Sequence, residues 1–175
     1  VLIVPMMFIC ELYRKSATPI ANIATSLLGA LYVALPMALL IVTPMLLGGG
    51  EWNPWIMILY IFIIWANDVF AYLFSITHGR QRLFERLSPK KSWEGFFGGI
   101  LFAVGFAMAA GYMMEGNILL WGGLGLVIAL AGVAGDLLES KIKRECGVKD
   151  SGNLIPGHGG MLDRFDALLF AAPFV

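Results

Sequence analysis

Residues Lys149 to Asp166, with the sequence KDSGNLIPGHGGMLDRFD, combine acidic, basic and glycine residues in a pattern suited to phosphate chemistry. Asp163 and Asp166 lie three positions apart, so on a helix beginning near Leu162 their carboxylates would share one face. Carboxylate oxygens are suitable ligands for Mg²⁺ that is carried with substrate phosphates. The glycines before this helix would let backbone N–H groups approach an anion at its N-terminus. The stretch therefore predicts a site for a metal ion and a phosphate group.

A purely structural interpretation of the same stretch stays open. The glycines would then only form turns, Asp163 would pair with Arg164 or a lysine, and His158 would be a hydrogen-bonded loop histidine. If His158 takes part in the chemistry, we favour a contact to a phosphate or head group over metal ligation, because Mg²⁺ prefers oxygen ligands.

A second polar cluster begins at Asp136, close to the end of an apolar segment. Glu139 and Ser140 follow three and four positions later, so all three can lie on one helix face, whereas Lys141 and Arg144 form a pair on a neighbouring face. The helix would place its acid at the membrane interface. The structural alternative is a basic collar that binds lipid head groups.

The segment HGRQRLFERLSPKKSWEGFFGG carries Lys90 and Lys91 directly before a predicted helix. Ser92 is expected to cap that helix, with Glu94 in its first turn. The two lysines could bind a triphosphate or a lipid phosphate. The ordinary alternative is a basic loop on an anionic membrane surface.

Asp68 lies inside the apolar sequence IFIIWANDVFAYLF. About ten residues separate it from the end of the segment, so at 1.5 Å per residue it would lie roughly 15 Å deep in the membrane. A carboxylate at that depth is costly and marks a functional site more often than not. A neutral Asp68 that is hydrogen-bonded to Tyr72 or to another helix would be the structural explanation.

Membrane helices must position these residues. Of 175 residues, 59% are hydrophobic and 14% are charged, and the mean hydropathy is +0.80, whereas an ordinary globular domain is about half apolar and about a quarter charged. Because a spanning helix needs about twenty mostly apolar residues, we predict an all-α, polytopic transmembrane helical bundle that forms one membrane-embedded domain over residues 1–175. The predicted spans are 20–47, 54–77, 95–114 and 117–138, with partial spans at 1–10 and from about 165.

Pro36 and Pro44 could kink the span at 20–47 or split it in two. The chain begins and ends inside apolar runs, so we expect a piece of a longer protein, with earlier helices missing and the last helix truncated.

The basic residues are confined to three segments, and the connectors GGGEWN and MEGN contain none. If the span at 20–47 crosses once, all three segments lie on one side, which the positive-inside rule makes the cytoplasm. A formal net charge of zero gives no indication of nucleic-acid binding. The three segments contain Arg14 and Lys15; Arg80, Arg82, Arg86, Lys90 and Lys91; and Lys141, Lys143, Arg144, Lys149 and Arg164.

Residues Ser140 to Asp166, SKIKRECGVKDSGNLIPGHGGMLDRFD, resemble the signature of the phosphatidate cytidylyltransferases, also called CDP-diacylglycerol synthases. The segments SPKKSWEGFFGG and NDVFAY also resemble family segments in the expected order, so the likeness covers most of the chain from about Asn67. This makes the chain similar to the C-terminal part of a family member. The matching positions are Ser140, Lys143-Arg144, Lys149-Asp150, His158-Gly159-Gly160 and Asp163-Arg164-Phe165-Asp166.

The resemblance implies transfer of a cytidylyl group from CTP to phosphatidate, giving CDP-diacylglycerol and pyrophosphate for phospholipid biosynthesis. It also implies a Mg²⁺ cofactor, with a second cation open, and a homodimer in the bacterial cytoplasmic membrane that meets CTP, phosphatidate and membrane lipids but no nucleic acid. The residues to which we assign roles are the metal ligands Asp136, Asp163 and Asp166; the catalytic phosphate contacts Lys143, Arg144 and His158; and the substrate contacts Asp68, Lys90, Lys91, Glu94, Ser140, Lys149 and Asp150.

Two other classes of function stay open at this point. Asp68 and the proline-containing span would suit a transporter or channel. Another lipid phosphotransferase or a lipid kinase would act on similar substrates, although the four-acid motif of enzymes that use CDP-diacylglycerol is not found in the sequence.

Overall fold

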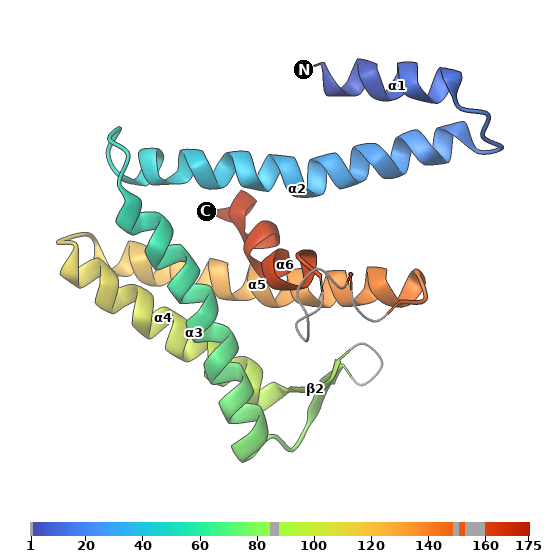
Figure 1. The fold of residues 1–175 in the computed structure, drawn as a ribbon. Helices are drawn as coiled ribbons and strands as arrows, with labels where there is room; N and C mark the ends of the chain where they lie inside the picture. Colours follow the sequence, from blue (N-terminus) through green and yellow to red (C-terminus); the bar gives the residue numbers. More distant parts are fainter. Residues whose placement is uncertain (1, 85–87, 149–150, 153–159) are drawn as a thin grey trace.

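The computed structural model of this chain describes residues 2–84, 88–148, 151–152 and 160–175. Helices dominate it (Figure 1), and a short antiparallel strand pair lies between α3 and α4. The helices are α1 (Ile3–Tyr13), α2 (Pro19–Leu47), α3 (Pro54–His78), α4 (Trp93–Met113), α5 (Ile118–Glu145) and α6 (Leu162–Ala171), followed by the 3₁₀ turn η1 (Ala172–Phe174); the strands are β1 (Arg82–Phe84) and β2 (Ser88–Ser92).

Four of these helices, α2 to α5, are long and apolar enough to cross a membrane. The predicted all-α polytopic bundle is therefore confirmed, and the predicted spans agree with the helices to within a few residues at most ends. The largest difference is in α5, which continues to Glu145 instead of ending near 138. The segment at 20–47 is a single helix, with Pro36 and Pro44 buried inside it.

Local sequence explains where these helices begin. Asn53 accepts a hydrogen bond from the Trp55 N–H at the start of α3, and Asn117 does the same for Leu119 at the start of α5. The predicted cap of α4 is confirmed, since the Ser92 hydroxyl accepts from the Gly95 N–H. Such caps satisfy backbone donors that would otherwise have no partner in the first turn.

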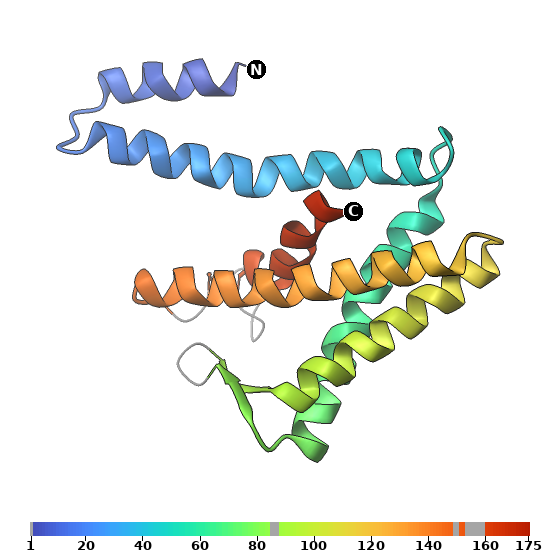
Figure 2. The ribbon, with the colours of Figure 1, turned by 180° about the vertical axis from the view of Figure 1, so that it is seen from behind.

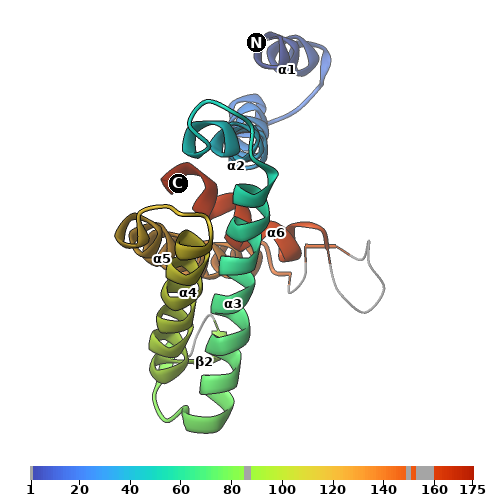
Figure 3. The same ribbon diagram turned by 90° about the vertical axis from the view of Figure 1, so that its left-hand side faces the viewer.

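Helices α3 and α4 lie side by side along most of their length (Figure 3). Glycine permits this approach: a Cβ atom at Gly98 would lie 2.6 Å from the ring of Phe74. Farther along, the rings of Phe70 and Phe102 stack with their centroids 3.8 Å apart. Small residues at helix contacts are typical of packing in membranes, where close van der Waals contact drives association.

The described parts of the three basic segments lie at one end of the bundle. In Figure 1 the connectors 48–53 and 114–117 lie on the left, whereas the α1–α2 connection, the strand pair and the end of α5 lie on the right. This arrangement follows from α2 being one continuous helix. The bundle therefore has one basic end.

Helix α6 returns from that basic end into the bundle, between α2 and α5 (Figure 2). Its position is fixed partly by Tyr60 of α3, whose hydroxyl donates a 2.7 Å hydrogen bond to the Leu168 carbonyl. Ala167 and Leu169 are buried in the same region. As a result, the first turn of α6 lies beside the last turns of α5.

The strand pair was not predicted from the sequence. Arg82 pairs with Ser92 and Phe84 with Ser88, with an irregularity between the two pairs. Strands of three and five residues, one containing proline and two lysines, show no alternation of polar and apolar residues that would reveal them. The pair matters because its second strand ends at the cap of α4 and carries Lys91.

Candidate functional site

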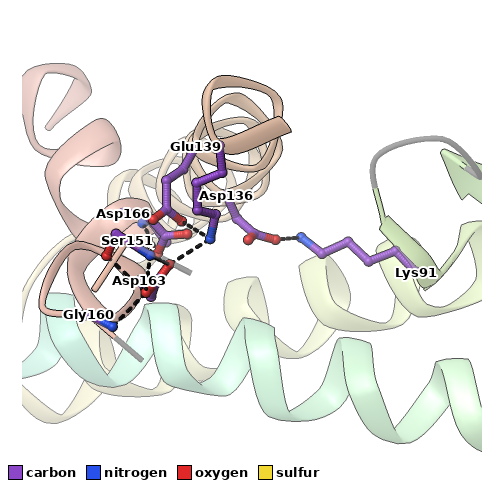
Figure 4. Close-up of polar contacts among 9 residues, drawn as sticks. Lys91, Asp136, Glu139, Ser151, Gly160, Asp163 and Asp166 are labelled. Carbon is purple, nitrogen blue, oxygen red and sulfur yellow. Dashed lines mark hydrogen bonds and ion pairs between the residues drawn. The ribbon is translucent and has the colours of Figure 1, made fainter. Parts of the chain in front are cut away.

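Three carboxylates from two helices meet near the basic end of the bundle. Asp136 and Glu139 belong to α5 and Asp166 to α6, and each offers an oxygen such that all three lie within 4.8 Å of one another (Figure 4). Glu139 and Asp166 are buried, with 2% and 8% of their surfaces exposed. Asp136 is about one-third exposed, so the cluster opens toward solvent on its side.

The two helices approach closely because of a glycine next to Asp136. A Cβ atom at Gly135 would lie 2.5 Å from the Cβ of Phe170 and 3.0 Å from the Asp166 carbonyl oxygen. Glu139 follows Asp136 by three positions, as the shared helix face required. The cluster is thus formed by helical spacing within α5 and by the close packing of α6 against it.

Asp163, in the first turn of α6, takes a different role in the structure. Its carboxylate accepts hydrogen bonds from the Ser151 N–H and hydroxyl, each at 2.9 Å, and from the Gly160 N–H at 2.7 Å. Burial alone would raise the pKa of this carboxyl, but these donors and Lys143 together hold its pKa well below its ordinary value. Asp163 is therefore a strongly ionised centre that organises the chain before α6.

Lys143 connects this centre with the three-carboxylate cluster. Its ammonium lies 2.6 Å from Asp163 Oδ1 and 3.3 Å from Glu139 Oε2. The side chain is largely buried, as are both of its partners. The structural interpretation of Asp163 predicted a pair with a lysine, and this pair is present. The lysine is Lys143, which is also one of the residues predicted to contact phosphate.

A polar cavity of about 930 Å³, including the solvent at its mouth, lies between the strand pair and the cluster. From the opposite side Lys91 of β2 reaches across to form an ion pair with Asp136 (Figure 4). The cavity is lined from α3, the strands, α4, α5 and α6 by Asn67, Asp68, Tyr72, Ser75, Lys91, Ser92, Phe96, Asp136, Asp163 and Asp166, among others. Both predicted acids of α6 therefore face the same space, together with Asp136 and Asp68.

The carboxylates present fit a divalent cation. Glu139 Oε1 is buried and has no hydrogen-bond partner within the described parts of the chain. An orphaned buried carboxylate oxygen is costly unless a cation or donor satisfies it. Hard oxygen ligands of this kind suit Mg²⁺. The donor set Asp136, Glu139 and Asp166 can therefore hold such an ion.

A model of the cytidylyltransferase family matches residues 1–175, which is the whole chain. The chain belongs to this family. Curated relatives named phosphatidate cytidylyltransferase are 45% identical over 124 residues in Aquifex aeolicus, 46% identical over 121 residues in Staphylococcus aureus and 36% identical over 164 residues in Rickettsia bellii. The family resemblance read from the sequence is thereby confirmed.

These alignments include 70%, 67% and 89% of this chain, but 46%, 46% and 69% of the respective relatives. The chain thus spans about half the length of the first two relatives. The site described above comes from α3 to α6, in the part of the chain where the signature lies.

The other predicted site residues lie farther from the three-carboxylate cluster. Arg144 is exposed in the last turn of α5, and Ser140 is half-buried one position after Glu139. Glu94 accepts a 3.4 Å hydrogen bond from the Gln81 N–H, so it holds the start of the strand pair to α4. Their predicted roles stay predictions. Lys149, Asp150 and His158 lie outside the described residues, as does the side chain of Lys90.

Glu139 and Ser151 were missed as site residues from the sequence alone. Glu139 had a usable signal, because it lies one turn after Asp136 and would be expensive to bury without a partner. Ser151 had none, since its role depends on its place beside Asp163, twelve positions along the chain.

Proposed function

We propose that this chain carries the centre at which a cytidylyl group passes from CTP to phosphatidate, giving CDP-diacylglycerol and pyrophosphate. The observation that carries the proposal is that three carboxylates of α5 and α6 meet beside the polar cavity, with Lys91 on the cavity wall and Lys143 paired to Asp163. Membership of the cytidylyltransferase family and the names of the curated relatives support the same reaction.

In the proposed reaction, an oxygen of the phosphatidate phosphate attacks the α-phosphorus of CTP. The bond from that phosphorus to the bridging oxygen breaks, and pyrophosphate leaves with the electron pair. A phosphate monoester has its second pKa near 6 and is largely ionised at neutral pH. No strong protein base is needed, and the main demand is to bring two anions together and to stabilise the charge that develops.

The basic residues in and beside the cavity are suited to that demand. Lys91 lines the cavity on the strand side, and Lys143 pairs with Asp163, which lines it from α6. We propose that Lys143, Arg144 and His158 contact the reacting phosphates. Substrate contacts are proposed for the residues Asp68, Lys90, Lys91, Glu94, Ser140, Lys149 and Asp150.

Mg²⁺ is the proposed cofactor, with Asp136, Glu139 and Asp166 as the residues that would hold it. Bound there, it would offset negative charge on the substrate phosphates. Asp163 was predicted as a ligand too, and its position on the cavity is compatible with that role. A second cation, the homodimer and the cytoplasmic orientation of the basic end also remain proposals.

Substitution of the cluster in the full-length protein tests this function. With phosphatidate as acceptor, radiolabelled CTP should give product and radiolabelled ATP should not. Asp166→Asn should lower the CTP-dependent rate by about 100-fold or more, because it removes a proposed ligand, and chelation of Mg²⁺ should do the same to the wild type. Lys141→Gln is a matched control, since Lys141 is exposed on α5. Normal turnover by Asp166→Asn would reject the metal assignment, and equal use of ATP would favour a kinase.

A further inference from the structure

Lys91 is the side chain that joins the strand pair to the acidic cluster. It projects from β2 and pairs with Asp136 of α5, 45 positions farther along the chain. Lys91 and Asp136 both line the polar cavity, and their side chains are 31% and 35% exposed. The ion pair is therefore open to the cavity and can be reached by a solute that enters it.

The charges around the cluster are divided between two lysines. Lys143 forms ion pairs with Glu139 and Asp163, whereas Lys91 forms one with Asp136. Asp136 in turn shares a site with Glu139 and Asp166. The Lys91 ammonium thus neutralises one of the carboxylates that a divalent cation would need.

The backbone next to Lys91 is held in place, although the Lys91 ammonium is open to the cavity. The next residue, Ser92, is 5% exposed, caps α4 through Gly95 and hydrogen-bonds at 3.0 Å to the Ser75 hydroxyl. A lysine ammonium on its flexible four-carbon stem can change partners by rotation within the side chain. Lys91 can therefore leave Asp136 and stay in the cavity without any movement of the strand pair.

We propose that Lys91 is an exchangeable counter-cation: its ammonium neutralises Asp136 until a divalent cation binds the cluster, and is then released to contact a substrate phosphate. The first half concerns only this chain's ion pair, and the second half rests on the proposed function. Because linkage is reciprocal, the exchange couples metal binding to phosphate binding. An anion that draws Lys91 away from Asp136 makes the cluster more acidic and favours the cation, and the cation frees Lys91 for the anion.

Binding of Mn²⁺ alone to the full-length protein in detergent tests the competition. Free Mn²⁺ is read by its electron paramagnetic resonance signal, without substrate. Lys91→Gln should bind Mn²⁺ about fivefold or more tightly than the wild type, since a typical coupling between sites has that size. Lys91→Arg keeps the charge and should bind as the wild type does. Lys141→Gln removes an exposed charge from α5 and should change the affinity by less than about twofold. Equal or weaker binding by Lys91→Gln would overturn the proposal.

Chemical labelling of amines in the wild-type protein gives an independent readout that needs no variant to fold. Saturating Mg²⁺ should increase the labelling rate at Lys91, read by mass spectrometry, and leave Lys141 unchanged. Asp136→Asn should give fast labelling at Lys91 with or without Mg²⁺. An equal labelling rate at Lys91 with and without Mg²⁺ in the wild type would overturn the exchange.

The two readouts separate this inference from the proposed function. Product formation from CTP with no effect of Lys91→Gln on Mn²⁺ affinity would reject the counter-cation and keep the transferase. Metal-dependent release of Lys91 in a protein that forms no product from CTP would reject the transferase and keep the exchange. No Mn²⁺ binding by the wild type would overturn the exchange itself.

Discussion

Lys143 Nζ lies 2.6 Å from Asp163 Oδ1, and this ion pair ties the end of α5 to the first turn of α6. The same ammonium lies 3.3 Å from Glu139. Only 3% of the Glu139 side chain and 12% of the Asp163 side chain are exposed, so both carboxylates are largely shielded from bulk solvent. One buried lysine therefore stabilises both the acidic face of α5 and the first turn of α6.

Lys143→Met should destabilise the protein strongly. The substitution keeps most of the apolar stem but leaves two largely buried carboxylates without their shared cation, which typically costs about 3 kcal/mol or more. Denaturant unfolding of the purified protein in detergent measures the loss. Lys141→Met, on the exposed face of the same helix turn, should change the free energy of unfolding by less than about 0.5 kcal/mol.

A second variant separates the charge effect from packing. In Lys143→Met combined with Glu139→Gln, one of the two stranded charges is gone, so part of the lost stability should return. If the double variant were no more stable than Lys143→Met, the ion pair with Glu139 would contribute nothing to the free energy of unfolding.

Acid should weaken the structure through Asp163. Burial raises the pKa of this carboxyl, but Lys143, Ser151 and Gly160 outweigh that effect and hold its folded-state pKa well below the ordinary value of about 3.9. A carboxyl with a depressed folded-state pKa stabilises the fold fully above its unfolded pKa, and that contribution is lost as pH falls toward the folded pKa. The wild type should thus lose stability progressively below about pH 5.

Asp163→Asn is the comparison for this pH effect, because it removes the titrating group and keeps its size. Thermal unfolding midpoints of both proteins, measured from pH 7 down to pH 3, should differ most at neutral pH and converge in acid. A constant difference over the whole range would show that Asp163 does not titrate in this way.

The positions of the membrane helices could be predicted because each one is an uninterrupted apolar run. The capping residues Asn53, Ser92 and Asn117 stand directly before those runs and indicate in the sequence where the helices start. The end of α5 was not, because residues 139–145 are polar and continue the helix beyond the apolar run. What keeps them helical is partly the ion pair of Lys143 with Asp163 of α6, which no local pattern shows.

The candidate site was predicted in its residue types but not in its pairing. Asp136, Asp163 and Asp166 were identified from spacing and family likeness, and all three line one cavity. The structure adds Glu139 to the cluster and binds Asp163 to Lys143 and to backbone donors. Such pairings depend on how α6 docks on α5, which spacing along the chain does not determine.

Glu139→Gln should weaken Mn²⁺ binding in the full-length protein by about 10- to 100-fold. The amide keeps the shape of the side chain but replaces one charged oxygen of the proposed ligand set with a donor that a cation repels. Ser151→Ala, which removes one of the donors to Asp163 and no oxygen of the cluster, should have a much smaller effect. Titration with Mn²⁺ followed by electron paramagnetic resonance distinguishes the two. Equal affinity in Glu139→Gln and the wild type would remove Glu139 from the ligand set.

Gly135→Ala should damage the site without altering any charged residue. The new Cβ would lie 2.5 Å from the Cβ of Phe170 and 3.0 Å from the Asp166 carbonyl oxygen. Neither neighbour is the flexible end of a side chain, so α6 must shift away from α5, at a cost of about 1–3 kcal/mol. The shift carries Asp166 away from Asp136 and Glu139, and Mn²⁺ affinity should therefore fall together with stability.

Gly132→Ala provides the matched control for this prediction. It lies one turn earlier on α5, and its new Cβ would meet only the Cβ of Ala167, at an ordinary 3.6 Å. Since alanine in a helix interior is more stable than glycine by about 0.5–1 kcal/mol, this variant should unfold at the same or a slightly higher denaturant concentration and keep its Mn²⁺ affinity. If both variants bound Mn²⁺ equally well, close packing at Gly135 would not be what holds the three carboxylates together.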